Sequence, residues 1–200
     1  MICQPLWFRE ALGVDAPLFL FVYTVTEKIL HSEYLYRGRV IKLRLDQVRL
    51  ANQHVAAREV VEHRGAVAII ALDAKQNVLL VRQYRAGVQR DLLEIPAGTL
   101  EDGEDPALCA VRELKEETGY SAAQWESLGY FYSSPGFCTE KLYLYLAREL
   151  TPGSASPEED ELISVVQMPL AQVVQSINQG ELPDAKTIVG IMRVWNHLNA

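Results

Sequence analysis

Residues 98–120 read GTLEDGEDPALCAVRELKEETGY, and this stretch predicts a loop that enters a helix. Asp105 can cap the helix, because its carboxylate can accept a hydrogen bond from a backbone N–H of the first turn. Pro106 suits the first helical position, and Gly119 suits the left-handed residue that commonly follows the last turn. With 3.6 residues per turn, the apolar side chains share one face of an amphipathic helix: Ala107, Leu108, Val111 and Leu114.

The opposite face of this helix carries glutamates at positions i, i+3 and i+4, which are Glu113, Glu116 and Glu117. Like charges at this spacing destabilise a helix, and only Lys115 is placed among them. Charged residues on an outer helix face are most often simply solvated. A divalent cation would remove the repulsion, and Mg²⁺ prefers carboxylate, water and phosphate oxygens. The stripe therefore predicts a metal site that leaves coordination positions open for a substrate's phosphates.

The spacing of these positions resembles the complete Nudix box, with Tyr120 at the final position, where an aliphatic residue is usual. The resemblance implies that the three glutamates of the stripe, called the box glutamates below, bind two or more catalytic magnesium ions. It implies that the backbone carbonyl of Ala97 adds a ligand and that Arg112 and Glu104 orient the loop and the helix. Arg112 and Glu116 are also expected to take part in catalysis. The other positions that are filled in register are Gly98, Leu114 and Gly119.

Composition limits the kind of protein. The 200 residues are 49% hydrophobic and 22% charged, which is enough for one substantial core, with or without a small appended element. The net charge of -7, without a basic run, argues against binding to nucleic acid or to anionic membranes. Three cysteines without metal-type spacing fit a reducing cytoplasm. Residues 16–25 are apolar but too few to span a bilayer, and we interpret them as an N-terminal strand or packing arm, with a dimer contact or an upstream extension as alternatives.

Alternating and apolar runs predict an α+β fold. Residues 28–61 predict antiparallel strands, and residues 66–72 and 78–83 predict a hairpin joined by Asp73–Asn77. The whole is expected to be a Nudix-type α/β/α sandwich of mixed sheets with flanking helices. We divide the chain into residues 1–60, an N-terminal extension with antiparallel strands that serves dimerisation, and residues 61–200, the Nudix hydrolase domain. Further strands are predicted at 128–133, 142–147 and 163–167, helices at 170–178 and 185–198, and an acidic loop at 151–161.

The flanks of the box resemble the ADP-ribose pyrophosphatase branch of the Nudix superfamily. That branch carries a proline about sixteen residues beyond the last glycine of the box, and Pro135 stands sixteen residues beyond Gly119. Similar segments are VRQYR at 81–85, LEIPAG at 93–98, SSPGFCTE at 133–140, VEHRGA at 61–66 and DAKTI at 184–188. The resemblance therefore covers most of the chain from about residue 26 onward.

This resemblance implies roles for further residues of the site. Arg85 and Glu94 are expected to line the pocket beside the box, and Glu140 to reach the terminal ribose or a metal-bound water. In the acidic loop, Glu159 is expected to be the general base and Glu161 a neighbour of the metal. The remaining residues expected to bind substrate are Arg58, Glu59, Ser134 and Pro135; a purely structural role for Arg58 and a solvated acidic loop are the alternatives.

The implied function is hydrolysis of the diphosphate of ADP-ribose to AMP and ribose 5-phosphate, with Mg²⁺ or, in its place, Mn²⁺. The substrate is thus a small nucleotide, and the resemblance also implies a homodimer. Within the enzyme class the alternative is a pyrophosphatase of GDP-sugars or other diphosphate-linked nucleosides. An alternative from another class is a non-catalytic sensor of ADP-ribose or nucleotides that has kept the fold and lost turnover.

Overall fold

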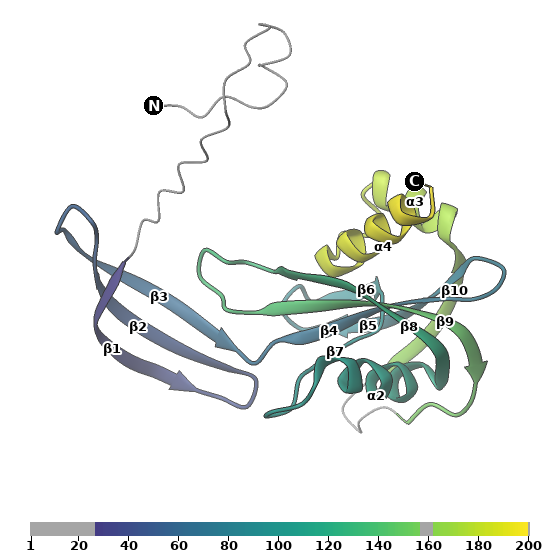
Figure 1. Ribbon diagram of the computed structural model, residues 1–200, viewed down its shortest axis with the longest axis horizontal. Coiled ribbons are helices and arrows are strands. Elements are labelled where there is room, and N and C mark those ends of the chain that lie inside the picture. Colours follow the sequence, from purple (N-terminus) through teal and green to yellow (C-terminus); the bar gives the residue numbers. More distant parts are fainter. Residues whose placement is uncertain (1–26, 157–161, 200) are drawn as a thin grey trace, which may run out of the picture.

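The computed structural model describes residues 27–156 and 162–199. These residues form a three-stranded antiparallel sheet and a larger body, in which a seven-stranded mixed sheet lies between helix α2 on one face and helices α3 and α4 on the other (Figure 1). The expected α+β sandwich with N-terminal antiparallel strands is therefore confirmed. The arm predicted at residues 16–25 lies outside the described residues.

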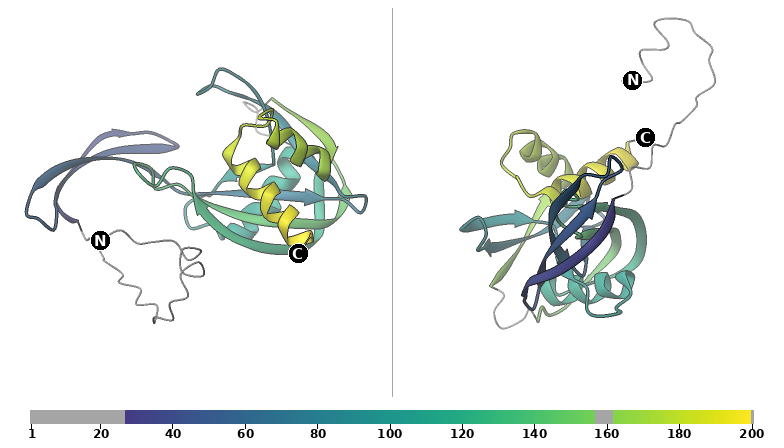
Figure 2. Two further views of the ribbon diagram at one scale, coloured as in Figure 1. Left: turned by 90° about the horizontal axis from the view of Figure 1, so that it is seen from above. Right: turned by 90° about the vertical axis from the view of Figure 1, so that its left-hand side faces the viewer.

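The three-stranded sheet, called the N-terminal sheet below, consists of β1 (Lys28–Arg37), β2 (Ile41–Arg49) and β3 (Val55–His63). Both strand pairs are antiparallel. The sheet projects away from the body, which Figure 2 shows from two further directions. All ten residues of β1 are exposed, so this strand offers side chains on both of its faces and an edge without a neighbouring strand in the described structure.

The central sheet of the body has the order β10-β5-β4-β9-β8, with β6 on β5 and β7 on β4. The predicted β4–β5 hairpin is confirmed, and its turn is closed by the carboxylate of Asp73, which accepts hydrogen bonds from the backbone N–H groups of Lys75 and Asn77. The seven strands are β4 (Ala66–Leu72), β5 (Asn77–Arg85), β6 (Arg90–Glu94), β7 (Ala97–Thr99), β8 (Tyr120–Tyr132), β9 (Lys141–Pro152) and β10 (Ile163–Pro169).

Strand β4 is buried on both faces and separates two hydrophobic cores. Ala68 and Ile70 point toward α3 (Leu170–Asn178) and α4 (Ala185–Leu198). Val67 and Ile69 point toward α2 (Pro106–Thr118). Because side chains alternate along a strand, a continuous apolar run is needed to fill both cores.

The predicted limits of the helices are confirmed. The Asp105 side chain accepts from Ala107 N, Pro106 begins α2, and Gly119 has a φ of 76° and donates its N–H to Lys115 O. Asp184 caps α4 in the same way, through a hydrogen bond from Thr187 N. None of the helices in the described residues is long and apolar enough to cross a membrane.

The apolar face predicted for α2 is only partly buried: Leu114 is buried as expected, but its other residues are not. Leu108 is 67% exposed and Val111 46% exposed. The face that packs on β4 instead contains the small residues Cys109 and Ala110, whose size allows the helix to approach the sheet closely. The complete set of buried residues on this helix is Cys109, Ala110, Leu114, Glu117 and Thr118.

The strand predictions also need correction. Strand β8 begins at Tyr120, eight residues before the predicted start at 128, because residues 120–127 pair with the second half of β9. Strand β9 continues to Pro152, so the segment predicted as a loop from 151 begins as a strand. Strands β6 and β7 were not predicted.

Candidate active site

Helix α2 and the segment Pro96–Thr99 are held together at one end of the sheet. The Glu117 carboxylate, which is buried, accepts a hydrogen bond of 3.0 Å from Ala97 N. Glu113 covers the next residue, since a Cβ atom added at Gly98 would lie 1.8 Å from Glu113 Cδ. A side chain at position 98 would displace the Glu113 carboxyl group, so the absence of one lets this glutamate lie against the backbone.

Arg112 is the centre of a cluster of carboxylates. Its Nε and Nη2 donate to the two oxygens of Glu104, each at 3.0 Å. Its Nη1 donates to Glu113 at 2.7 Å and to Glu116 at 2.9 Å. One guanidinium thus connects the loop before α2 with two glutamates of the helix, and its hydrogen bond to Glu104, together with the charge of Glu113, raises the pKa of Arg112.

The cavity on one side of Gly98 and Thr99, called the lysine cavity below, has basic and polar walls. Its lining includes Arg85 from β5 and Lys186 from α4. Ser133 and Glu140, at the two ends of the loop between β8 and β9, also line it, as do Thr99 and Asp184.

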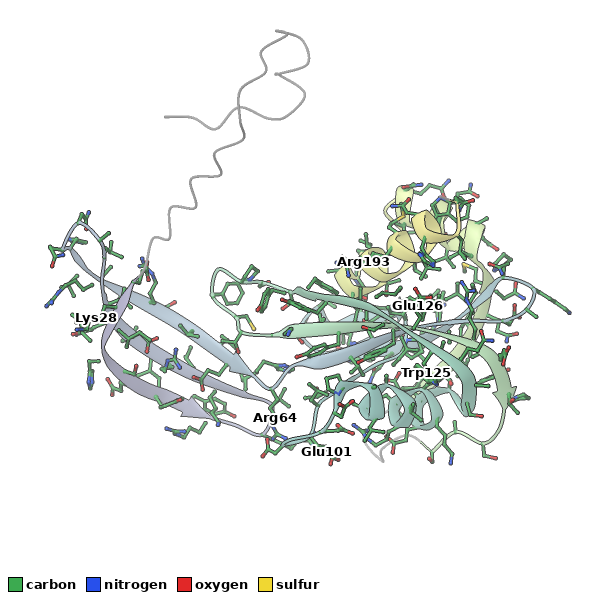
Figure 3. The ribbon with its side chains drawn as sticks, in the orientation of Figure 1. Lys28, Arg64, Glu101, Trp125, Glu126 and Arg193 are labelled. Atoms are coloured by element: carbon green, nitrogen blue, oxygen red, sulfur yellow. The ribbon has the colours of Figure 1, made fainter. Side chains whose placement is uncertain are left out.

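A second cavity lies on the other side of the same two residues and is called the arginine cavity below. It is lined by Arg39 of the β1–β2 turn, by Arg64 and by Arg112, and also by Glu101, Glu113 and Glu116. Arg64 Nη2 donates to Arg39 O at 3.0 Å, so the β1–β2 turn of the N-terminal sheet is hydrogen-bonded to the segment that leads into β4. Figure 3 shows Arg64 and Glu101 at this junction.

Comparison with known proteins places this arrangement in a family. Residues 62–188 match the NUDIX domain. The chain belongs to the Nudix hydrolase family. Residues 27–61, which hold most of the N-terminal sheet, match the nucleoside diphosphate sugar hydrolase N-terminal domain.

Individual Nudix relatives cover most of the chain. It is 41% identical to the methanol dehydrogenase activator of Bacillus methanolicus, over 82% of this chain and 90% of the relative. It is 39% identical to the ADP-ribose pyrophosphatase of Bacillus subtilis, over 84% of this chain and 92% of the relative. It is 33% identical to the GDP-mannose pyrophosphatase of Cronobacter sakazakii, over 85% of this chain and 93% of the relative. A crystal structure titled ADP compounds hydrolase has the same fold, with a TM-score of 0.77, 24% identity and coverage of 87% of this chain and 95% of that chain.

The Nudix glutamates offer oxygen donors of the type that a divalent metal ion prefers. Within residues 27–156 and 162–199, no three His, Cys, Asp or Glu side chains converge closely enough to hold a metal ion. Glu113 and Glu116 bond to Arg112, and Glu117 bonds to Ala97 N. All three are hard oxygen donors, the chemistry that Mg²⁺ prefers, and they lie within two turns of one helix beside the partly exposed backbone at Gly98.

The residues predicted around the Nudix box are brought together only in part. Arg85 and Glu140 line the lysine cavity. Ser134 and Pro135 are not among its lining residues; the carbonyl of Ser134 instead accepts from Phe137 N and Cys138 N, which closes the turn of the loop. The loop is attached to the N-terminal sheet, because Val61 N donates to Phe137 O and Thr139 N donates to Val61 O.

Arg58 and Glu59, predicted to bind substrate, lie on β3 and line neither cavity beside the box. Arg58 forms an ion pair with Glu27 at 2.6 Å. Glu159 and Glu161 lie outside the described residues.

Glu94 is buried behind the lysine cavity rather than in its wall. It is 1% exposed, and it accepts hydrogen bonds from Arg85 and from Lys186. Burial opposes the charged form of Glu94, but the hydrogen bond from Arg85 and the charge of Lys186 outweigh burial, so the pKa of Glu94 is lowered. Sequence reasoning missed Lys186, although the segment 184–188 that contains it had been noted as similar to the family.

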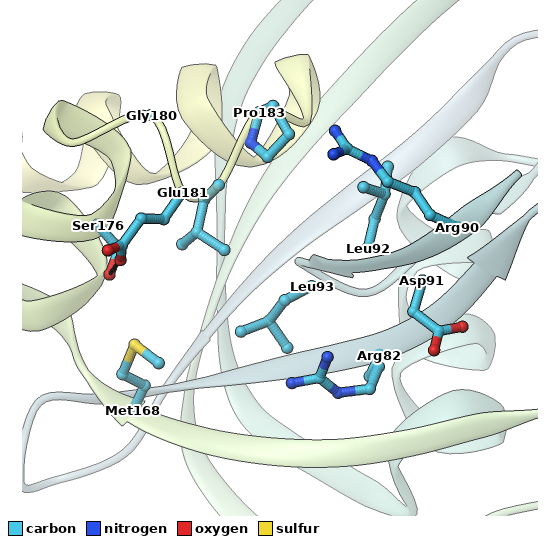
Figure 4. A pocket seen from close by; sticks show the side chains of 11 residues that line it. Arg82, Arg90, Asp91, Leu92, Leu93, Met168, Ser176, Gly180, Glu181 and Pro183 are labelled. Carbon is cyan, nitrogen blue, oxygen red and sulfur yellow. Dashed lines mark hydrogen bonds between the residues drawn. The ribbon is translucent and has the colours of Figure 1, made fainter. Parts of the chain in front are cut away.

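A third cavity contains none of the Nudix box residues. Figure 4 shows Arg82 and Arg90 reaching into it from β5 and β6, with Leu93 and Met168 nearby. On the opposite side, Glu181 accepts a hydrogen bond from Ser176. The α3–α4 connection lines this cavity, which is not part of the site.

The ion pair between Glu104 and Arg112 gives a testable dependence of stability on pH. The hydrogen bond from Arg112 lowers the pKa of Glu104 from 4.5 to about 2. A carboxylate with a lowered pKa stabilises the fold above its unfolded pKa, and this stabilisation is lost as the pH falls from about 4.5 toward 2. At roughly 1.4 kcal/mol per pKa unit, Glu104→Gln should lower the free energy of unfolding at pH 7 by up to about 3 kcal/mol.

Urea unfolding at several pH values tests this expectation. The difference in unfolding free energy between the wild type and Glu104→Gln should shrink as the pH falls through 4 and vanish near 2. Asp102→Asn is the matched control, because the Asp102 side chain in the same loop is 90% exposed. A constant difference between pH 7 and pH 3 would contradict the assigned role of Glu104.

Proposed function

We propose that this Nudix hydrolase cleaves the diphosphate of ADP-ribose to AMP and ribose 5-phosphate in the presence of Mg²⁺. The observation that carries the proposal is that Gly98 and Thr99 border two cavities whose walls carry arginine and lysine side chains, while Glu113 and Glu116 line one of the two, the arginine cavity. A diphosphate has two substituents, and the two cavities offer a place for each. The relatives named ADP-ribose pyrophosphatase, at 39% and 41% identity, support this choice of substrate.

The box glutamates and the backbone carbonyl of Ala97 are proposed to hold two or more Mg²⁺ ions, with Mn²⁺ able to replace them. Bound metal would neutralise the diphosphate and lower the pKa of a coordinated water. Arg112 holds Glu113 and Glu116 in place through its hydrogen bonds, which restricts their rotamers. Arg85 can donate from its planar fork to a phosphate oxygen pair in the lysine cavity.

Proton transfer is proposed to involve Glu159, with Glu161 near the metal. The support is the path of the chain before them: Ser156 N donates to Glu116 O at 3.0 Å, so the acidic segment starts beside the Nudix helix. Three residues of extended chain reach at most about 10 Å, which is enough to bring Glu159 to the box glutamates. Glu140, at the edge of the lysine cavity, is proposed to contact the ribose.

A substrate panel tests the proposed function. We would compare kcat/KM for ADP-ribose, GDP-mannose, NADH, FAD and diadenosine polyphosphates with Mg²⁺, and identify products by chromatography. ADP-ribose should be preferred and should release AMP. Preference for GDP-mannose would favour the second candidate, which the relatives named GDP-mannose pyrophosphatase support at lower identity. Binding without turnover of any diphosphate would favour a nucleotide sensor.

We also propose that the protein is a homodimer that uses the N-terminal sheet. Strand β1 exposes Ile29, Leu35 and Tyr36, each more than half accessible, and its edge has no partner strand in the described structure. Exposed apolar surface and an unpaired edge both favour association. In an isologous dimer, the same face of each copy would be covered.

Sedimentation equilibrium at assay concentration should give the mass of two chains, and Leu35→Asp should shift the equilibrium toward one chain. Lys28→Asp, which changes charge at the end of the same strand where the side chain is already polar, is the matched control (Figure 3). A fully active protein that sediments as a monomer would exclude the dimer.

The proposed compartment is the cytoplasm. Cys109 and Cys138 are both free cysteines in the structure. Burial raises the pKa of the Cys109 thiol to about 12, which keeps it protonated and unreactive. Free thiols of this kind suit a reducing compartment.

A further inference from the structure

Lys186 occupies a position where helix physics disfavours a cation. It is the second residue of α4, two positions after the cap residue Asp184. The N-terminus of a helix carries a partial positive charge, which favours acidic side chains and opposes a lysine. A residue that conflicts with its local structure calls for another reason for its presence.

The ammonium group of Lys186 is held in a partly buried network of charges. It donates to Glu94, and it donates to Asp184 Oδ1 at 3.1 Å. Arg85 donates to Glu94 at the same time, with 2.6 Å between Nη2 and Oε2. One fully buried carboxylate therefore holds an ammonium and a guanidinium side by side, although Glu94 and Lys186 are 92 residues apart in the sequence.

Both cations keep donors that this network does not use. An ammonium has three N–H donors, and two acceptors are found for Lys186 among the described residues. Arg85 donates to Glu94 through Nε and Nη2, so its Nη1 takes no part in this ion pair. Lys186 and Arg85 both line the lysine cavity beside Gly98 of the Nudix box, whereas Glu94 does not. The two side chains that keep unused donors are therefore in the wall of the cavity, and the carboxylate that holds them is not.

We propose that Lys186 binds a phosphate oxygen of the substrate together with Arg85, and that Glu94 is the positioning residue that holds the two cations at the correct separation. This inference rests on the proposed diphosphate substrate and adds a phosphate-binding residue to it. The four charges of Arg85, Lys186, Glu94 and Asp184 sum to zero, so the cations act through directed hydrogen bonds rather than through an excess of positive charge. Adjacent fixed donors of this kind suit the tetrahedral oxygens of a phosphate.

Binding of the two expected products, measured by calorimetry without metal, tests the proposal independently of turnover. The probes are AMP and ribose 5-phosphate, with adenosine and ribose as their phosphate-free counterparts. Lys186→Met should weaken binding of at least one phosphorylated probe by roughly 10- to 100-fold, the range expected for a hydrogen bond to a charged group. Binding of its phosphate-free counterpart should be unchanged. Equal affinities of wild type and variant for both phosphorylated probes would overturn the proposal.

Lys186→Gln keeps an N–H donor for Glu94 and removes the positive charge. It replaces Lys186→Met if that variant does not fold, and the same loss of affinity for the phosphorylated probe is expected.

Glu94→Gln separates positioning from simple electrostatics. It makes the cavity more positive by one charge, which should strengthen phosphate binding if only the field matters. If Glu94 positions the cations, binding should weaken instead, and stronger binding would overturn its role.

Kinetics complete the test and separate it from the proposed function. If the wild type cleaves ADP-ribose, Lys186→Met should lower kcat/KM by a similar factor, with a higher KM. If the wild type cleaves no diphosphate but binds AMP or ribose 5-phosphate through Lys186, the proposed function fails and the phosphate site stands. If the wild type is active and Lys186→Met has the same kcat/KM, the role of Lys186 is wrong, but the proposed function stands.

Discussion

Glu117→Gln is expected to lower kcat/KM for ADP-ribose by roughly 10³-fold, or about 4 kcal/mol of transition-state stabilisation. The change removes one negative charge from the donor set on α2 and leaves its shape almost unaltered. Gln can still accept the hydrogen bond that Ala97 N donates to Glu117. Because no apolar area is lost, the melting temperature should fall by no more than about 3 °C.

Steady-state kinetics over a range of Mg²⁺ concentrations, together with thermal unfolding, would measure both effects. Glu113→Gln should behave in the same way. Glu126→Gln is the matched control, because this glutamate lies on β8, half exposed, where its only ion pair in the described structure is with His197. If Glu113→Gln or Glu117→Gln retained near wild-type kcat at saturating Mg²⁺, the metal site would have to lie elsewhere.

Local elements of this fold could be predicted because their signals lie within a few residues. The caps of α2 depend on Asp105 and Gly119, which bond within the adjacent turn. The β4–β5 hairpin depends on Asp73, which bonds two and four residues ahead. Such short-range hydrogen bonds form in the same way in most contexts, so the residue type alone identifies them.

The buried face of α2 could not be read from periodicity, because two faces overlap on this helix. The more apolar one contains Leu108 and Val111, and the one that packs contains Cys109 and Ala110. The choice depends on the sheet opposite, where a close approach requires small side chains. Strand β8 shows the same limit, since its first half is mostly small or polar and extends only because β9 pairs with it.

The candidate site could be predicted where it follows one helix and not where it joins distant elements. The box glutamates and Arg112 lie on α2, so their spacing alone brings them together. The contact of Lys186 with Glu94 joins α4 to β6, and nothing in the spacing of either segment indicates it. Burial of Glu94 was equally hidden, because only the tertiary structure supplies two cations to neutralise it.

The second large effect is expected at Glu159, in the segment that follows Ser156. If Glu159 accepts the proton of the attacking water, Glu159→Gln should lower kcat by roughly 10² to 10⁴, because general-base assistance acts only in the transition state. KM for ADP-ribose and the Mg²⁺ concentration for half activity should change little. The hydrogen bond between Ser156 N and Glu116 O fixes the start of this segment at the helix that carries the box glutamates.

Glu161→Gln is the matched variant, since the same chemical change two residues further on should act on metal binding instead. It should raise the Mg²⁺ concentration that gives half-maximal activity and restore kcat at saturation, whereas no amount of Mg²⁺ should restore kcat in Glu159→Gln. Wild-type behaviour of both variants would assign the acidic segment to solvent. The base would then have to be Glu116, beside the bound Ser156 N, or Glu140, which borders the lysine cavity, or hydroxide on the metal.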